Sequence, residues 1–146
     1  MEYRLGTEKD VAELKKLDTA SAEVDAIGGR KFFVLRSRRM IEYFIACHGL
    51  LVAETDGRIV GYALTHVVEW MHGVAKMAWV EHVGVHPDSR RRGVALRLVR
   101  FAARHYKGRA RCLYGEIHPK NARSLGLFRK VRAELVERVL AFRKIR

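Results

Sequence analysis

The residues best suited to chemistry stand between two predicted elements. Arg90-Arg91-Arg92-Gly93-Val94-Ala95 follows a run typical of a strand, residues 77–85, and precedes a helical run, residues 96–104. Free amides at a helix start, together with the helix dipole, favour a negatively charged ligand. The stretch therefore predicts an anion site. The alternative is a solvated turn in which Gly93 relieves a tight bend.

The distribution of charge also favours an anionic partner. The chain has a formal net charge of +13; residues 87–146 hold 18 Lys and Arg against 4 Asp and Glu, whereas residues 1–86 hold 11 against 12. Such a bias fits a phosphate-bearing small molecule or a nucleic acid. Aromatic residues are not interleaved with the basic ones, as they would be in a protein that stacks on bases.

The elements that position this stretch can be read from the sequence. At 146 residues and 49% hydrophobic content, the chain is expected to form one domain, residues 1–146, with its own core. Residues 2–6 predict an edge strand, and residues 7–18 predict a helix with Thr7 and Asp10 as a capping box. A second helix is predicted over residues 37–47, with the Gly-bearing loop 27–33 before it as a candidate substrate rim.

A hairpin and a β-α-β-α-β run follow. Asp56-Gly57 predicts a two-residue turn between strands, and a turn at residues 71–73 leads to the strand over 77–85. The next helix has a basic side made by Arg97, Arg100, Arg104 and Lys107. The rest is predicted as a strand (111–117), a helix (121–131) and a closing strand (134–145). This order predicts an α/β or α+β fold.

Two motifs resemble the GNAT superfamily of N-acetyltransferases. Val85-His86-Pro87 leads into Arg90-Arg91-Arg92-Gly93-Val94-Ala95, and a helix with Asn121, Ser124 and Phe128 follows in the family's order. The resemblance implies a mixed sheet splayed between two central parallel strands and flanked by about four helices. It also implies acetyl-CoA as co-substrate, with its pyrophosphate on the amides of residues 91–95.

The resemblance also implies the remaining contacts with acetyl-CoA. The main chain of Val83 and Val85 would pair with the pantetheine arm, and Arg90, Asn121 and Phe128 would complete the cofactor site. The excess of arginine in the same half of the chain fits the phosphates of CoA.

Acetyl transfer needs a base, because an amine is wholly or partly protonated at pH 7. Glu116 is the first candidate, since it lies where the ribosomal-protein alanine N-acetyltransferase branch carries its catalytic glutamate. Glu81 is the reserve. For both, the alternative is a surface or salt-bridged carboxylate, and a nearby cation would lower the pKa of such a carboxylate.

The sequence departs from the family pattern at two places. Phe128 stands where the family usually has a Tyr that protonates the CoA thiolate. Ser124 lies one helical turn earlier and is a candidate to donate this proton instead. The alternative is that Ser124 only caps or packs the helix. Arg132-Ala133 replaces Gly-Phe and puts in doubt the turn into the last strand.

The leading hypothesis is an N-acetyltransferase that acts by direct transfer on an amine, with a protein or peptide N-terminus ahead of a small-molecule amine. The alternatives are a CoA binder without catalysis and a basic module that binds nucleic acid or the ribosome. A homodimer stays open.

The sequence also favours a cytoplasmic protein without metal. No apolar run reaches the roughly 20 residues of a membrane span, and Cys47 and Cys112 are predicted to be buried free thiols. His82 and His86 are predicted to lie about 13 Å apart on one strand, too far to share an ion. The absence of Gln and the single Asn indicate a hot-living source.

Overall fold

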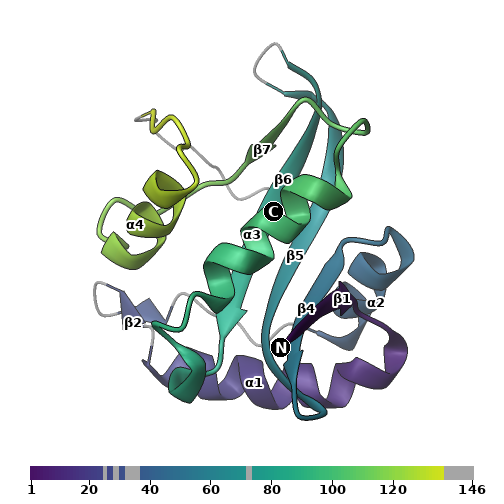
Figure 1. Cartoon of the computed structure of the whole chain (residues 1–146), viewed down its shortest axis with the longest axis vertical. Coiled ribbons are helices and arrows are strands. Elements are labelled where there is room, and N and C mark those ends of the chain that lie inside the picture. Colours follow the sequence, from purple (N-terminus) through teal and green to yellow (C-terminus); the bar gives the residue numbers. More distant parts are fainter. Residues whose placement is uncertain (25, 28–29, 32–36, 72–73, 137–146) are drawn as a thin grey trace, which may run out of the picture.

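A mixed sheet is the centre of the molecule (Figure 1). The computed structural model describes residues 1–24, 26–27, 30–31, 37–71 and 74–136. The sheet has five strands in the order β1-β4-β5-β6-β7, and only β6 and β7 run parallel. Their bounds are β1 Glu2–Leu5, β4 Leu50–Thr55, β5 Arg58–Met71, β6 Val74–Val85 and β7 Cys112–Tyr114. The mixed α/β fold is confirmed.

The hairpin between β4 and β5 forms at the predicted turn. Asp56 and Gly57 both have positive φ, 51° and 70°, which is the geometry of the two-residue turn that matches the twist of paired strands. The turn sets Thr55 opposite Arg58, and a β-bulge at Val60 then shifts the register by one residue, so that Leu50 lies opposite Leu64.

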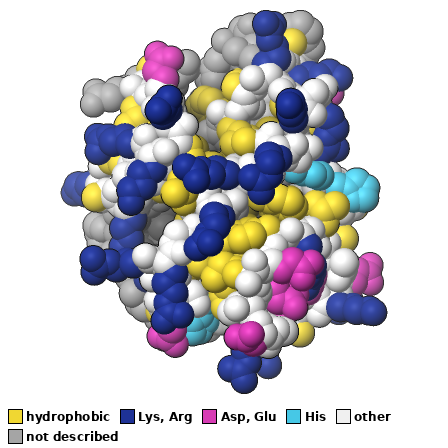
Figure 2. Space-filling view, in the orientation of Figure 1, with side chains coloured by type: hydrophobic (Ala, Val, Ile, Leu, Met, Phe, Trp, Pro, Cys, Tyr) yellow, Lys and Arg dark blue, Asp and Glu magenta, His cyan; other side chains and the backbone are white. Residues whose placement is uncertain are grey.

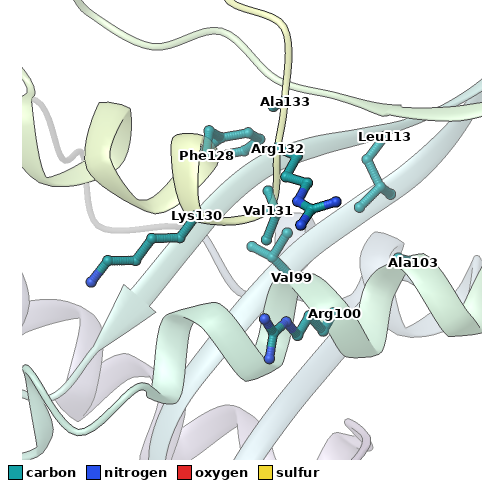
Figure 3. A pocket seen from close by; sticks show the side chains of 9 residues that line it. All are labelled: Val99, Arg100, Ala103, Leu113, Phe128, Lys130, Val131, Arg132 and Ala133. Carbon is teal, nitrogen blue, oxygen red and sulfur yellow. The ribbon is translucent and has the colours of Figure 1, made fainter.

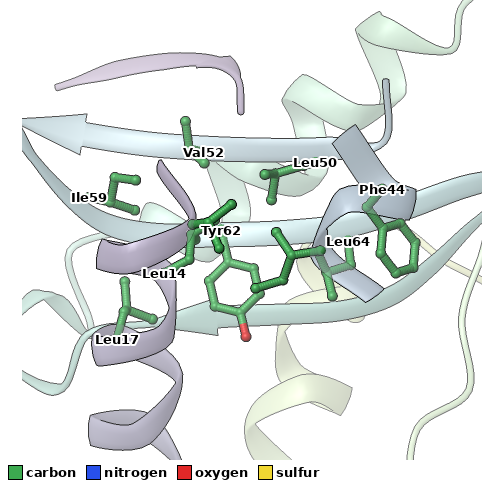
Figure 4. Close-up of a cluster of buried hydrophobic side chains, with 10 residues drawn as sticks. Leu14, Leu17, Phe44, Leu50, Val52, Ile59, Tyr62 and Leu64 are labelled. Carbon is green, nitrogen blue, oxygen red and sulfur yellow. The ribbon is translucent and has the colours of Figure 1, made fainter. Parts of the chain in front are cut away.

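One face of the sheet is covered by α1 (Val11–Val24) and α2 (Arg38–Ala46). A 3-10 turn, η1 (Glu8–Asp10), leads into α1, where the Asp10 carboxylate accepts from Thr7 N at 2.7 Å and completes the capping box. Figure 4 shows how both helices pack on β4 and β5. The buried side chains of this layer include Leu14, Leu17, Phe44, Leu50, Val52, Ile59, Tyr62 and Leu64. Burying each contributes about 1.5–3 kcal/mol, which holds the helices to the sheet.

The other face carries α3 (Val94–His105), which Figure 1 shows lying over the sheet, roughly along β5 and β6. Its residues Val94, Leu98 and Ala102 are buried against β4 and β5. Close approach depends on Gly61, because a Cβ there would stand 2.8 Å from Val94 Cγ1. The predicted basic side of this helix lies opposite these buried residues and is exposed.

The two parallel strands separate soon after they meet. β7 pairs with β6 only from Met77 opposite Cys112 to Trp79 opposite Tyr114, whereas β6 continues to Val85. The register of β6 on β5 also shifts between Val80 and His82, so that Glu81 is the extra residue of a β-bulge. The expected splay between the central parallel strands is therefore present.

Several local predictions need correction or lie outside the described residues. The strand expected over 111–117 is only β7, and residues 134–136 of the expected closing strand have no regular structure, while 137–146 lie outside the described part. The loop 27–33 includes the ends of a small antiparallel pair, β2 (Ala26–Ile27) and β3 (Arg30–Lys31), and its remaining residues lie outside that part. Of the expected turn at 71–73, Met71 belongs to β5 and 72–73 are not described.

The cysteine prediction was wrong for one residue. Cys47 is half-buried, but Cys112 is exposed, because β7 is the outermost strand of the described sheet. Both thiols are free.

Candidate functional site

The loop before α3 has the geometry of an anion cradle. Arg91 and Gly93 both have left-handed backbone, with φ of 61° and 77°. Left-handed residues next to right-handed ones turn successive amides toward one side, forming a concave nest of N–H groups. The first bond of α3 runs from Arg97 N to Gly93 O at 3.0 Å, so the amides of residues 93–96 have no acceptor within the helix.

The charged side chains around this loop add to the positive potential of its free amides. Arg91 and Arg92 are exposed, Arg90 is half-buried, and the sequence contains no Asp or Glu between Asp88 and Glu116. The free amides, the helix dipole and the arginines all favour a dianion such as a pyrophosphate. The residues predicted to hold the CoA pyrophosphate therefore fit such a group.

β6 offers an open edge beside this loop. His86 N donates to Val60 O at 2.9 Å, which fixes the alternation of hydrogen bonds between β5 and β6. Because of this alternation, the main-chain amide and carbonyl groups of Val83 and Val85 point away from β5, toward the side where β7 has already ended. No described strand pairs with β6 there, so an extended ligand has an edge to pair with.

Arg90 closes one end of this edge. Its Nε donates to the carbonyl oxygen of Val85 at 3.2 Å and so ties the loop to the end of β6. This contact occupies the Val85 carbonyl, whereas no side chain among the described residues bonds the main chain of Val83.

The two candidate bases lie on either side of the separation between β6 and β7. Glu81 is the bulged residue of β6, and Glu116 lies two residues after the end of β7. Both side chains are exposed, and neither forms an ion pair or accepts a hydrogen bond from a described residue. The salt-bridged alternative therefore finds no support among the described residues.

The helix α4 (Ala122–Lys130) carries the remaining predicted site residues. Asn121 caps it, since Asn121 Oδ1 accepts from Ser124 N at 3.0 Å. The Ser124 side chain is half-buried, and Phe128 is buried, with its ring 3.4 Å from the position a Cβ on Gly115 would take. Phe128 thus lies against the chain that leads from β7 to Glu116.

The C-terminal end of α4 keeps a regular turn although Arg132-Ala133 replaces the family's Gly-Phe. Ala133 N donates to Phe128 O and Arg132 N to Arg129 O, which is the Schellman pattern of a helix end. Arg132 takes the left-handed position, φ 60°, that glycine usually occupies. The turn is kept without glycine, at a cost of about 1 kcal/mol.

A cleft of about 520 Å³ lies between α3 and α4 (Figure 3). Its lining combines apolar side chains, among them Val99 and Leu113, with the cations Arg100, Lys130 and Arg132. Of the predicted cofactor residues, only Phe128 lines it. The anion cradle is thus a separate feature at the start of α3.

A group of aromatic rings that was not predicted from the sequence lies beside the candidate bases. Tyr43 of α2, His66 of β5, Trp79 of β6 and Tyr114 of β7 form this ring cluster, with neighbouring ring centroids 4.9–6.4 Å apart. The four residues are far apart in sequence and meet only through the strand register. The available signal was that Trp79 and Tyr114 each precede a candidate base by two residues.

The described residues hold neither a metal cluster nor a membrane-spanning helix. They contain no group of three or more His, Cys, Asp or Glu side chains arranged to hold a metal ion. No helix among them combines the length and the apolar character needed to cross a membrane.

Comparisons with known proteins identify the class. The model of the Acetyltransferase (GNAT) family matches residues 21–132. The chain therefore belongs to the GNAT family of acetyltransferases, which transfer acyl groups from acetyl-CoA. No curated protein matches its sequence.

Solved structures share the fold over nearly the whole chain. The aminoglycoside N-acetyltransferase AAC(6')-Iy in complex with CoA has a TM-score of 0.76 at 21% identity, covering 99% of both chains. The ribosomal-protein-alanine N-acetyltransferase from Brucella melitensis biovar Abortus 2308 has a TM-score of 0.73 at 19% identity, covering 99% of this chain and 100% of that one. At these identities the likeness shows a common fold.

Proposed function

We propose that this acetyltransferase moves the acetyl group of acetyl-CoA directly to the α-amine of a protein or peptide N-terminus, with Glu116 as the base. The observation that carries this proposal is the position of Glu116. It is an exposed, unpaired carboxylate among the described residues, just beyond the point where β6 and β7 separate. A carboxylate without a cation partner keeps its ability to accept a proton.

The donor would lie across the anion cradle and the open edge of β6. The amides of residues 91–95 would hold the pyrophosphate, with Arg90, Arg91 and Arg92 around it. The pantetheine arm would pair with Val83 and Val85, and Asn121 and Phe128 would flank it from α4. These positions are supported by the free amides and by the direction of the Val83 and Val85 main chain.

The chain's residues then have distinct parts in the reaction. Glu116, directly or through one water, removes a proton from the acceptor ammonium, and Glu81 is the reserve for this step. The neutral nitrogen forms a bond to the acetyl carbon while the bond from that carbon to sulfur breaks. The thiolate leaves with the electron pair, and the surplus proton of the acetylated nitrogen passes to it through Ser124 or a water. A thiol with a pKa near 8.5 needs no strong acid.

The charge of the protein favours a peptide over a polycationic sugar. Structural neighbours include enzymes named for aminoglycosides and one named for a ribosomal protein. Aminoglycosides carry several ammonium groups, which a protein of net charge +13 repels. A peptide N-terminus contributes only one such charge at the reacting end.

An acceptor panel tests the proposal. Thiol release from acetyl-CoA is measured with N-terminal peptides, free amino acids, polyamines and an aminoglycoside side by side. We expect the highest kcat/KM with peptides. Faster turnover of a small amine would replace the peptide proposal with the small-molecule alternative.

A calorimetric titration separates binding from transfer. We expect CoA to bind with micromolar affinity. CoA binding without thiol release from any acceptor would indicate a binder without catalysis, and no binding at several-fold excess of CoA would end the proposed donor site.

A second candidate function, nucleic acid or ribosome binding, rests on the basic face. Residues 89–133 contain 14 Lys and Arg and a single acidic residue, Glu116. Figure 2 shows Lys and Arg side chains spread over the side of the molecule that carries α3 and α4. A phosphate backbone would bind such a face with a steep dependence on salt.

A filter-binding salt series tests this second function. RNA affinity that falls steeply with salt and that CoA does not compete supports it. RNA binding abolished by CoA would mean that both ligands use the anion cradle, and no RNA binding at low salt would remove this function.

We also propose a cytoplasmic location in a hot-living source. Both cysteines are free thiols, as expected in a reducing compartment. The near absence of Asn and Gln supports a high working temperature. A thermal unfolding midpoint within the roughly 45–65 °C range of mesophilic domains would contradict the hot-living source.

A further inference from the structure

The ring cluster forms a continuous band from α2 to the sheet. The Tyr43 and His66 ring centroids are 6.3 Å apart, those of His66 and Trp79 are 6.4 Å apart with the rings nearly parallel at 14°, and those of Trp79 and Tyr114 are 4.9 Å apart. Phe44 supports the band from the core, with its ring 5.8 Å from His66. Rings in this arrangement offer both faces and edges to an apolar or planar group.

This band ends where the reaction is proposed to occur. Trp79 and Tyr114 are the last residues paired between β6 and β7, and Glu81 and Glu116 each follow two residues later. Two residues of extended chain span at most about 7 Å, so both carboxylates start close to the rings. A pantetheine arm running from the cradle along Val85 and Val83 heads toward the same point.

The cluster also has capacity for a ligand. Tyr43 is 55% exposed, and His66, Trp79 and Tyr114 are only partly buried. His66 Nδ1 is buried without a hydrogen-bond partner among the described residues. This nitrogen is closed off from a ligand, so the capacity lies in the exposed ring of Tyr43 and the partly exposed rings beside it.

We propose that the ring cluster is the acceptor subsite for an apolar or aromatic side chain at the second position of the peptide whose N-terminus is acetylated. This inference rests on the proposed function. Ring faces attract an apolar side chain and tolerate the single nearby ammonium, while the net charge of +13 disfavours further cations.

Two peptides that differ only at the second position, Phe or Ser, test the assignment. We expect the wild-type protein to favour the Phe peptide about ten-fold or more in kcat/KM, the range that apolar pockets achieve. Tyr43→Ala and the more conservative Trp79→Leu should reduce this preference to about two-fold or less, with the KM for acetyl-CoA unchanged. Tyr3→Ala is the matched control, since Tyr3 lies on the edge strand β1 outside the cluster.

A binding readout keeps the test independent of turnover. Trp70→Phe leaves Trp79 as the single tryptophan, so its fluorescence should change with the Phe peptide more than with the Ser peptide. Equal kcat/KM for both peptides in the wild type, or an unchanged preference in folded Tyr43→Ala and Trp79→Leu variants, would overturn the assignment.

A pair of monoamines distinguishes failure of the peptide proposal from failure of the subsite. If peptides are not acetylated but phenethylamine is preferred over ethanolamine, and Tyr43→Ala removes that preference, the ring subsite stands for small amines and the peptide function falls. If peptides are acetylated without any preference at the second position, the function stands and the subsite falls.

Discussion

The side chain of Arg97 lies across Gly93. Its Nη2 donates to Arg92 O at 2.7 Å and lies 3.5 Å from the position that a Cβ on Gly93 would take. The anion cradle is therefore held by a side chain from the first turn of the helix that it precedes, and glycine is needed for backbone conformation rather than for space.

Gly93→Ala tests whether the left-handed backbone conformation of residue 93 is needed for CoA binding. With φ at 77°, alanine costs about 1–2 kcal/mol of unfolding free energy, measured by denaturant titration. We expect CoA affinity, measured by calorimetry, to fall as well, because the amides of the nest reorient. Gly108→Ala is the control, since Gly108 has φ 79° and open space around it but lies beyond the other end of α3. Equal loss of CoA affinity in both variants would mean that the effect is global.

Glu116→Gln and Glu81→Gln identify the base. We expect Glu116→Gln to lower kcat about 100-fold or more with little change in CoA affinity, the usual contribution of a general base. Glu81→Gln should change kcat only a few-fold. A larger decrease in kcat for Glu81→Gln than for Glu116→Gln would make Glu81, in the β-bulge, the base. An unchanged kcat in both variants would mean that neither residue acts as a base.

The ion pair between Arg4 and Asp10 makes stability depend on acid pH. Two bonds of 2.8 Å from the Arg4 guanidinium hold the pKa of Asp10 below its ordinary value, about 3.9. Because the folded pKa is lowered, the stabilisation is complete above that ordinary value and is lost as pH falls through the folded one. Asp10→Asn should lower the free energy of unfolding by about 2 kcal/mol at pH 7, and by less at pH 3, which lies below the ordinary pKa.

Denaturant titrations at both pH values test this expectation. Glu42→Gln, which breaks the exposed pair with Arg38, is the control and should leave the free energy of unfolding nearly unchanged at both pH values. If Asp10→Asn lowers the free energy of unfolding equally at pH 3 and pH 7, the loss arises from packing and not from the ion pair.

The two cysteines should react at different rates. Cys112 is exposed, whereas burial raises the pKa of the Cys47 thiol and lowers its thiolate fraction. With DTNB we expect one fast thiol, which Cys112→Ser removes and Cys47→Ser keeps. Two fast thiols in the wild type would contradict the burial of Cys47. Thiol-release assays therefore benefit from the Cys112→Ser background.

Features set by local sequence were predictable. The Asp56-Gly57 turn, the Thr7 capping box and the basic side of α3 follow from residues a few positions apart, and the nest of amides before α3 falls within the first family motif. The bulge at Glu81 and the ring cluster arise from strand register, which no short window contains. The exposure of Cys112 had the same origin, because an apolar run does not show where its partner strand is missing.

The short ladder between β6 and β7 has a thermodynamic consequence. Three register pairs join the chain after α3 to the rest of the sheet, so an extended ligand on the open edge would act as a missing strand. Such a ligand adds to the folding free energy by mass action, about 2.7 kcal/mol at a hundred times its dissociation constant. The melting temperature of this protein would then rise and fall with the concentration of acetyl-CoA, and its lifetime in the cell would follow the supply of its own substrate.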